Sequence, residues 1–137
     1  MLSIVYSSRA SDSFDEAYLV DLLLRSRRNN KRLGLSGMLL HHGGHFLQAI
    51  EGPEDALRER MAIIASDPRH SSLRMLLEEE IPERTFPAWT MGHVEADDEP
   101  AAPGLRNVFE ALAAGGDVSD SLPSLRELIR WYQVRAA

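Results

Sequence analysis

The 137-residue sequence contains no cysteine. This absence excludes disulfide frameworks, thiol catalysis and cysteine-based zinc or iron–sulfur sites. No apolar run approaches the roughly 20 residues that a membrane helix needs, and no charged leader precedes a long apolar stretch at the N-terminus. We therefore expect a soluble, unprocessed protein of the cytoplasm that does not interact with membranes.

Positive charge is also scarce. The chain has 15 Lys and Arg against 21 Asp and Glu, a net charge of −6 and a pI near 5.3. Nucleic-acid binding usually depends on a basic surface that attracts phosphates, so we expect no DNA or RNA partner. With 44% hydrophobic residues, the chain suits one compact domain with a short appendage and is too short for two full domains.

The apolar patterns predict an alternation of strands and helices. Runs rich in β-branched and aromatic residues indicate strands, and apolar residues at helical spacing indicate helices. Asp12 or Ser13 is the expected N-cap of the first helix, and Gly43-Gly44 predicts a tight hairpin. The expected elements are a strand at 2–6, a helix at 15–29, strands at 37–41 and 45–50, a helix from Pro53 to about 67, and strands at 73–81 and 89–95.

This β-α-β-β-α-β-β order predicts the fold class. With only two helices, it favours an α+β, ferredoxin-like sandwich in which a five-stranded sheet has both helices on one face. Residues 96–103 are rich in Asp, Glu, Ala and Pro and are interpreted as a linker between a domain at 1–95 and a helical cap at 104–137. The cap has helical patterns at 105–113 and 123–134. The second is apolar enough that we expect it to cover the open sheet face or a second subunit.

Two polar residues fall at positions that should be apolar. Alternation turns Tyr6 toward the helices, on the face of Leu2 and Ile4, and it turns Gln48 to the inner face of its own strand. A buried phenol and a buried amide both need hydrogen-bond partners. For either residue alone, a satisfied polar group in the core is the ordinary explanation. The pair together suggests a ligand site.

Two further pairs have both ordinary and functional interpretations. Asn29 and Asn30 close the first predicted helix, where asparagine is a common cap, but adjacent carboxamides can also recognise the carbonyl, N–H, carbonyl edge of a flavin. Trp89 and Met91 alternate along the last predicted strand and share a face. Core packing is their simplest role.

Five strings carry a resemblance to a known family. They are VYSSRA, SRRNN followed by LGLSGMLL, GGHFLQAIEG, SDPRHSS and RTFPAWTMG, in this order and spacing. Over roughly residues 1–95 the chain resembles the BLUF domain, a family of blue-light sensors that use FAD. Ser36 stands where the family often has threonine, which keeps a hydroxyl. The remainder resembles short family members, which carry a cap of helices in place of an enzymatic output domain.

The resemblance implies roles for individual residues. Tyr6 would be the photochemical electron and proton donor, and Gln48 would be the amide switch between Tyr6 and the N5/C4 carbonyl edge of the flavin. Asn30 would hold the C4 carbonyl and N3–H, with Asn29 near the C2 carbonyl. The other implied positions are Leu22 and Ile64 on either side of the isoalloxazine ring, Arg69 and His70 near the ribityl and phosphate end, and Trp89 and Met91 as the pair that responds when Gln48 rearranges.

The implied cofactor is FAD, with FMN also possible. The implied function is a blue-light photoreceptor without enzymatic activity, which signals by contact with an unidentified downstream protein. We also expect a homo-oligomer.

Other classes of function remain open on the residues alone. A flavin-binding redox protein is one alternative, although no nicotinamide-binding glycine motif is present. A second is a ligand-free interaction module. A third is a hydrolase or metal protein built on His41, His42, His45 and His70. Alternation puts His41 and His45 on one face and His42 on the other, without an acidic ligand at suitable spacing, so solvated histidines are the simpler interpretation and no metal is expected.

Overall fold

The computed structural model describes residues 1–10, 15–42, 44–66, 70–86, 91–95, 105–115 and 119–136. The elements confirm the predicted order of strands and helices. They are β1 (Leu2–Ala10), α1 (Glu16–Leu33), β2 (Ser36–His42), β3 (His45–Gly52), α2 (Glu54–Ser66), β4 (His70–Glu80), β5 (Gly92–Glu95), α3 (Leu105–Ala114), the 3-10 helix η2 (Ser119–Ser121) and α4 (Leu122–Ala136).

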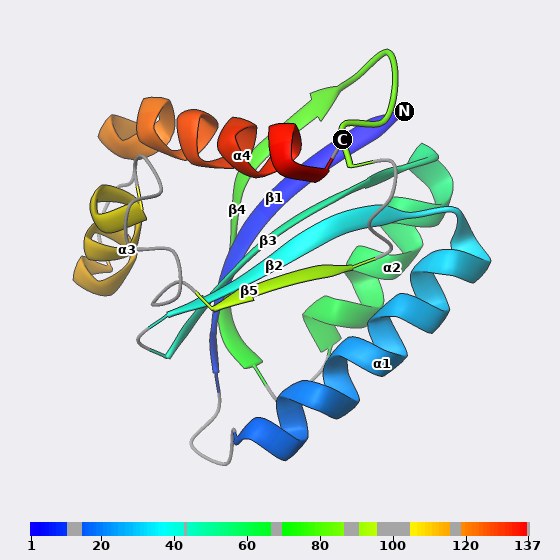
Figure 1. The fold of residues 1–137 in the computed structure, drawn as a ribbon, viewed down its shortest axis with the longest axis horizontal. Helices are drawn as coiled ribbons and strands as arrows, with labels where there is room; N and C mark the ends of the chain where they lie inside the picture. The colour runs from blue at the N-terminus through cyan, green and yellow to red at the C-terminus, as the bar shows by residue number, and fades with distance from the viewer. Residues whose placement is uncertain are drawn as a thin grey trace.

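The strands form one sheet in the order β4-β1-β3-β2-β5. The first four pair antiparallel, and the short β5 runs parallel to β2. Helices α1 and α2 lie on one side of this sheet, and α3 and α4 lie on the other (Figure 1). The α+β, ferredoxin-like class is confirmed. The last helix, whose partner the sequence left open, packs on the open face of the sheet.

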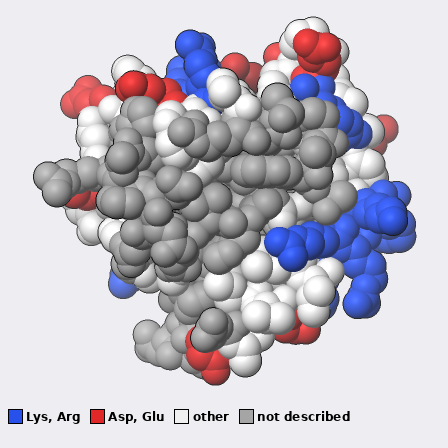
Figure 2. Space-filling view, in the orientation of Figure 1, with Lys and Arg blue, Asp and Glu red and all other residues white. Residues whose placement is uncertain are grey.

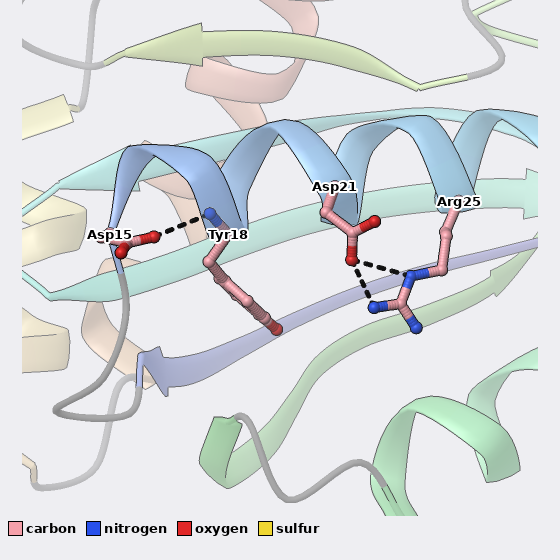
Figure 3. Close-up of polar contacts among 4 residues, drawn as sticks. All are labelled: Asp15, Tyr18, Asp21 and Arg25. Carbon is pink, nitrogen blue, oxygen red and sulfur yellow. Dashed lines mark hydrogen bonds and ion pairs between the residues drawn. The ribbon is translucent and has the colours of Figure 1, made fainter.

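Helix α1 begins at a different cap from the one predicted. Asp15 is the N-cap, and its side chain accepts a hydrogen bond of 2.8 Å from the backbone N–H of Tyr18 (Figure 3). Asp21 and Arg25 form an exposed ion pair on the following turn. The prediction of Asp12 or Ser13 as the cap is therefore wrong, since the capping bond is made directly before the helix.

The end of α1 also differs from the prediction. The helix continues past Asn29 and Asn30 to Leu33, and Gly34 closes it in the left-handed conformation with φ 73°. The intervening residues are good helix formers, and glycine adopts that conformation without steric cost. The interpretation of Asn30 as the cap is thus wrong. Adjacent residues of a helix point about 100° apart, so Asn30 is fully buried while Asn29 is half-buried.

The sheet separates two sets of buried side chains, as the alternation along the strands predicts. The set under α3 and α4 includes Val5, Met38, Leu40, Leu47, Ala49, Leu125, Leu128 and Tyr132. The set under α1 and α2 includes Leu2, Ile4, Tyr6, Ile50, Leu57, Met61 and Ile64, together with Leu19, Leu23, Leu39, Phe46 and Met91. The predicted inner stripe of α2, Leu57, Met61 and Ile64, is confirmed.

One carboxylate, Glu51, is buried at the end of β3, with 1% of its surface exposed. Its Oε1 accepts hydrogen bonds from the backbone N–H groups of Thr85 and Phe86, at 2.7 and 2.6 Å, and from the Ser36 hydroxyl at 3.1 Å. Its Oε2 accepts from the Thr85 hydroxyl. Glu51 therefore ties β3 to the segment that leads toward β5.

The histidines of the hairpin lie differently from the prediction. His42 and His45 are directly opposite each other, so they share a face, whereas His41 packs against Phe46 on the other face. Alternation cannot be counted straight through the two-residue turn, which makes 42 and 45 neighbours. All three histidines are half-buried, not solvated. Among the described residues, no group of three or more His, Asp or Glu side chains could hold a metal ion.

Two other predictions concern the second half of the chain. The last strand begins at Gly92, later than predicted, so Met91 precedes it. The predicted linker at 96–103 lies outside the described residues.

In the described part of the chain, no helix has the length and apolar character to cross a membrane.

Candidate functional site

Tyr6 and Gln48 meet on the face of the sheet that α1 and α2 cover. They are directly opposite in the antiparallel register of β1 and β3, so their side chains point the same way. Both are buried, with 2% and 8% of their surfaces exposed. The Tyr6 hydroxyl donates a hydrogen bond to Gln48 Oε1. The phenol and the amide that the sequence singled out are therefore in direct contact.

Gln48 has a second partner in Met91. Gln48 Nε2 donates to Met91 Sδ over 3.4 Å, and a thioether sulfur is a weak acceptor. The amide oxygen thus faces the phenol, and the amide nitrogen faces the sulfur. Rotating the amide by half a turn would exchange its oxygen and nitrogen between these two neighbours. The Gln48 amide therefore has two distinguishable orientations.

Burial raises the pKa of the Tyr6 phenol above its usual value, and the charge of the Arg60 guanidinium opposes this effect. A buried phenolate would lose its hydration. The phenol therefore stays protonated at neutral pH. It can lose its proton at that pH only if an electron leaves as well.

These residues line a pocket between α1 and α2. The pocket has a cavity volume of about 60 Å³. Among the lining residues Ile63 is exposed, and Tyr18, Leu22 and Arg60 are half-buried. The described lining consists of Tyr6, Ser8, Tyr18, Leu22, Ser26, Leu39, Phe46, Gln48, Arg60, Ile63, Ile64 and Met91.

One polar atom in this pocket indicates a missing partner. Ser8 Oγ is buried and has no hydrogen-bond partner among the described residues, and native structures rarely leave such a group unsatisfied. Leu22 and Ile64, from the two facing helices, provide apolar walls. Apolar walls with a few convergent polar groups suit a flat, mostly apolar ligand with a polar edge. A flavin ring has this character, so the residues fit it.

The structure brings together part of the predicted set. Tyr6, Gln48, Met91, Leu22 and Ile64 line one pocket. The two asparagines do not appear among its described lining residues. Asn30 is fully buried one turn beyond Ser26, which does line the pocket. Arg69 and Trp89 lie outside the described residues, and of His70 only the backbone is described.

Several lining residues were missed by the sequence reasoning. Ser8 follows Tyr6 by two residues in β1, and Tyr18 and Ser26 flank Leu22 by four residues in α1. These spacings are the signals that could have found them, since they put each residue on the face of a neighbour already chosen. Arg60 precedes Ile64 by one turn of α2 in the same way.

Comparison with known proteins decides the family. A family model described as sensors of blue-light using FAD, the BLUF domain, matches residues 1–92. The chain belongs to the BLUF family. This is a family of flavin-binding blue-light sensors, and the match covers β1 through α2 and β4 to the start of β5.

Two curated relatives are much longer than this chain. The chain is 31% identical over 114 residues to the photoactivated adenylate cyclase subunit beta of Euglena longa. The aligned region covers 82% of this chain but only 13% of the relative. It is 30% identical over 86 residues to the blue light- and temperature-regulated antirepressor BluF of Escherichia coli, covering 63% of the chain and 21% of that protein. The chain thus spans a small part of these curated relatives.

Among solved structures, the dark state of the BLUF protein BlrB is similar over 96% of both chains, with 34% identity and a TM-score of 0.76. A bacterial light-regulated adenylyl cyclase is 25% identical, with a TM-score of 0.75 over 84% of this chain and 34% of the cyclase.

Proposed function

We propose that this BLUF domain senses blue light with a flavin held between α1 and α2, and that Tyr6 and Gln48 convert excitation into a change of hydrogen bonding. The observation that carries the proposal is the hydrogen bond from the buried Tyr6 hydroxyl to Gln48 Oε1 in the wall of the pocket. This hydrogen bond joins a proton donor, Tyr6, to an amide that has two distinguishable orientations.

FAD is the proposed cofactor, since the family description names it. FMN is the alternative, because the related Klebsiella pneumoniae protein BlrP1 has been solved with FMN. Leu22 and Ile64 would flank the ring, and the buried Asn30 would hold its imide edge with Asn29 nearby. Arg69 and His70 would lie toward the phosphate end. Ser8 Oγ, which has no described partner, is available to a ligand atom.

The chemistry follows from the phenol and the amide. When bound and excited by blue light, a flavin supplies a strong oxidant beside Tyr6. Tyr6 would supply both an electron and its phenolic proton to a bound flavin, and the bond to Gln48 Oε1 would start the path of that proton. The return of both to Tyr6 would allow the Gln48 amide to adopt its rotated orientation. The rotated amide would no longer donate to Met91, so we propose that Met91 and Trp89 are the residues that respond to the rearrangement of Gln48.

The signal must end in a changed affinity, because a conformational change affects a partner only through contacts that differ between the two states. We propose residues 1–95 as the sensor, 96–103 as a linker and 104–137 as a helical cap, with no enzymatic activity of its own. Similarity to BlrB over 96% of both chains supports this short type. The cyclase relatives support a downstream protein as the target. A homo-oligomer is also proposed.

The decisive experiment is an absorption spectrum of purified protein in darkness and after blue light. We expect a flavin spectrum with a small, reversible red shift. Tyr6→Phe should retain the flavin and abolish the shift. Tyr132→Phe is the matched control, since it removes a buried phenolic hydroxyl on the opposite face of the sheet, and it should keep the shift. A colourless protein would refute flavin binding, and a full shift in Tyr6→Phe would remove Tyr6 from its role.

A further inference from the structure

A contact from α1 reaches the residue that Gln48 touches. Arg27 Nε donates a hydrogen bond of 2.9 Å to the backbone oxygen of Met91, across 64 positions of sequence. Leu23, one turn earlier on α1, packs in the same apolar cluster as Met91. Arg27 therefore stands at the edge of the helix face that covers the pocket, beside the start of β5.

Met91 is thus held at two points of unequal strength. Its sulfur accepts the weak bond from Gln48 Nε2, whereas its backbone oxygen accepts a bond from a charged guanidinium. Charge-assisted hydrogen bonds are roughly twice as strong as neutral ones. Rotation of the Gln48 amide removes only the weaker attachment. The Arg27 bond then decides whether Met91 stays close to Gln48 or moves away.

We propose that Arg27 is a positioning residue, which holds Met91 against Gln48 and thereby sets how fast the light-induced arrangement returns to the dark one. This inference rests on the proposed function of Tyr6 and Gln48. The Arg27 contact favours the arrangement in which Met91 lies beside Gln48 over any arrangement in which this segment moves off, because only the first keeps the bond.

The other cations of α1 provide the contrast. Lys and Arg side chains gather on the part of the surface where the C-terminal half of α1 lies (Figure 2). Arg25 pairs with Asp21 on its own helix, and Arg28 is exposed. Within the described residues, Arg27 is the α1 cation with a bond to the segment before β5. A loss of general helix charge can therefore be separated from the loss of this bond.

The test compares Arg27→Gln, Arg28→Gln and Arg27→Lys in the flavin-loaded, full chain. Glutamine keeps good helix propensity but removes the charge, and lysine keeps a cationic donor. In darkness, we expect amide hydrogen exchange over 91–95 to rise about tenfold in Arg27→Gln, as for the loss of one charge-assisted bond at a local opening. After a blue flash, the recovery rate should change at least about threefold, with the flavin content unchanged. Arg28→Gln should match the unmodified protein, and Arg27→Lys should lie between.

Each result decides the inference. Unchanged exchange and recovery in Arg27→Gln would overturn it, and so would equal changes in Arg28→Gln, which would point to helix charge alone. If Arg27→Gln does not fold, Arg27→Lys carries the test, and recovery identical to that of the unmodified protein would then count against the inference. A missing red shift in the unmodified protein would overturn the proposed function instead, so the two failures are distinguishable.

Discussion

The two faces of the sheet use the same strands, but one buried polar group on each face, Glu51 and Ser8, differs in its partners. On the face under α3 and α4, the buried carboxylate of Glu51 accepts four hydrogen bonds, from Ser36, Thr85 and Phe86, within a largely apolar core. On the face under α1 and α2, Ser8 Oγ lacks a described partner and a pocket opens beside Tyr6 and Gln48.

This difference shows where the fold ends and the site begins. Burying a polar group costs free energy unless the protein supplies its partner. At Glu51 the chain itself meets that requirement, which stabilises the fold. At Ser8, on the α1/α2 face, no described residue meets it, and this is the polar group that we propose is available to a ligand. The predictions below test this division from the largest expected effect to the smallest.

Leu128→Ala should affect stability, and Ile64→Ala should affect the ligand. Leu128 is a fully buried residue of α4 that packs in the core beneath this helix, so its truncation leaves a cavity and should lower the free energy of unfolding by about 2–5 kcal/mol. Ile64 borders existing space in the pocket, so its truncation should mainly weaken flavin retention. Denaturant unfolding and the flavin-to-protein absorbance ratio measure the two effects. Equal flavin loss in both variants would mean that the faces are not separate.

Glu51→Gln should weaken the link between β3 and the segment at 84–86. Each described partner of the Glu51 carboxylate donates a hydrogen bond to it. An amide nitrogen cannot accept such a bond, so replacing one carboxylate oxygen by nitrogen removes one charge-assisted bond or more. The expected loss is about 1–3 kcal/mol in the free energy of unfolding, with the flavin absorption maximum unchanged. Urea denaturation of both proteins checks this. A shifted flavin spectrum would show that Glu51 and its hydrogen-bond donors, on the α3/α4 face, also affect the pocket on the other face.

Tyr6 should make stability fall at alkaline pH. Its phenol has a raised pKa in the folded protein, so above pH 10 the unfolded chain releases this proton while the folded protein keeps it. The stabilisation is therefore complete below pH 10 and is lost as pH rises toward the folded pKa, by at most about 1.4 kcal/mol per pH unit. The difference in unfolding free energy between the unmodified protein and Tyr6→Phe, measured from pH 9 to 11, should show this slope. Parallel curves would contradict it.

Asp15→Ala should cost about 1 kcal/mol, the usual value of an N-cap. Its carboxylate accepts from the Tyr18 backbone N–H at the start of α1 (Figure 3). Tyr18 also lines the pocket, so fraying of this turn should loosen the flavin as well. Arg25→Gln, which breaks an exposed ion pair on the same helix, is the control and should cost less than about 0.5 kcal/mol. Thermal unfolding with and without flavin measures both.

Much of the fold could be predicted because local patterns carry it. Alternation put Tyr6 and Gln48 on the face that α1 and α2 cover. Helical spacing gave the buried stripe of α2, which consists of Leu57, Met61 and Ile64. The errors fell where one local signal competed with another. Asn30 looked like a cap because asparagine often ends helices, but good helix formers carry α1 on to Gly34. His45 was placed on the wrong face because a turn interrupts the alternation.

Composition and periodicity thus sufficed for the class of fold and for the facing of Tyr6 and Gln48. The resemblance in the motifs indicated the family that the comparison then showed. They could not reveal that Ser8 Oγ would have no partner among the described residues, that Glu51 would accept bonds from residues 36, 85 and 86, or that Arg27 would reach Met91 across 64 positions. A sequence pattern reports which way a side chain points along its own element. Which atoms it meets depends on how separate elements pack, and only the folded chain decides that.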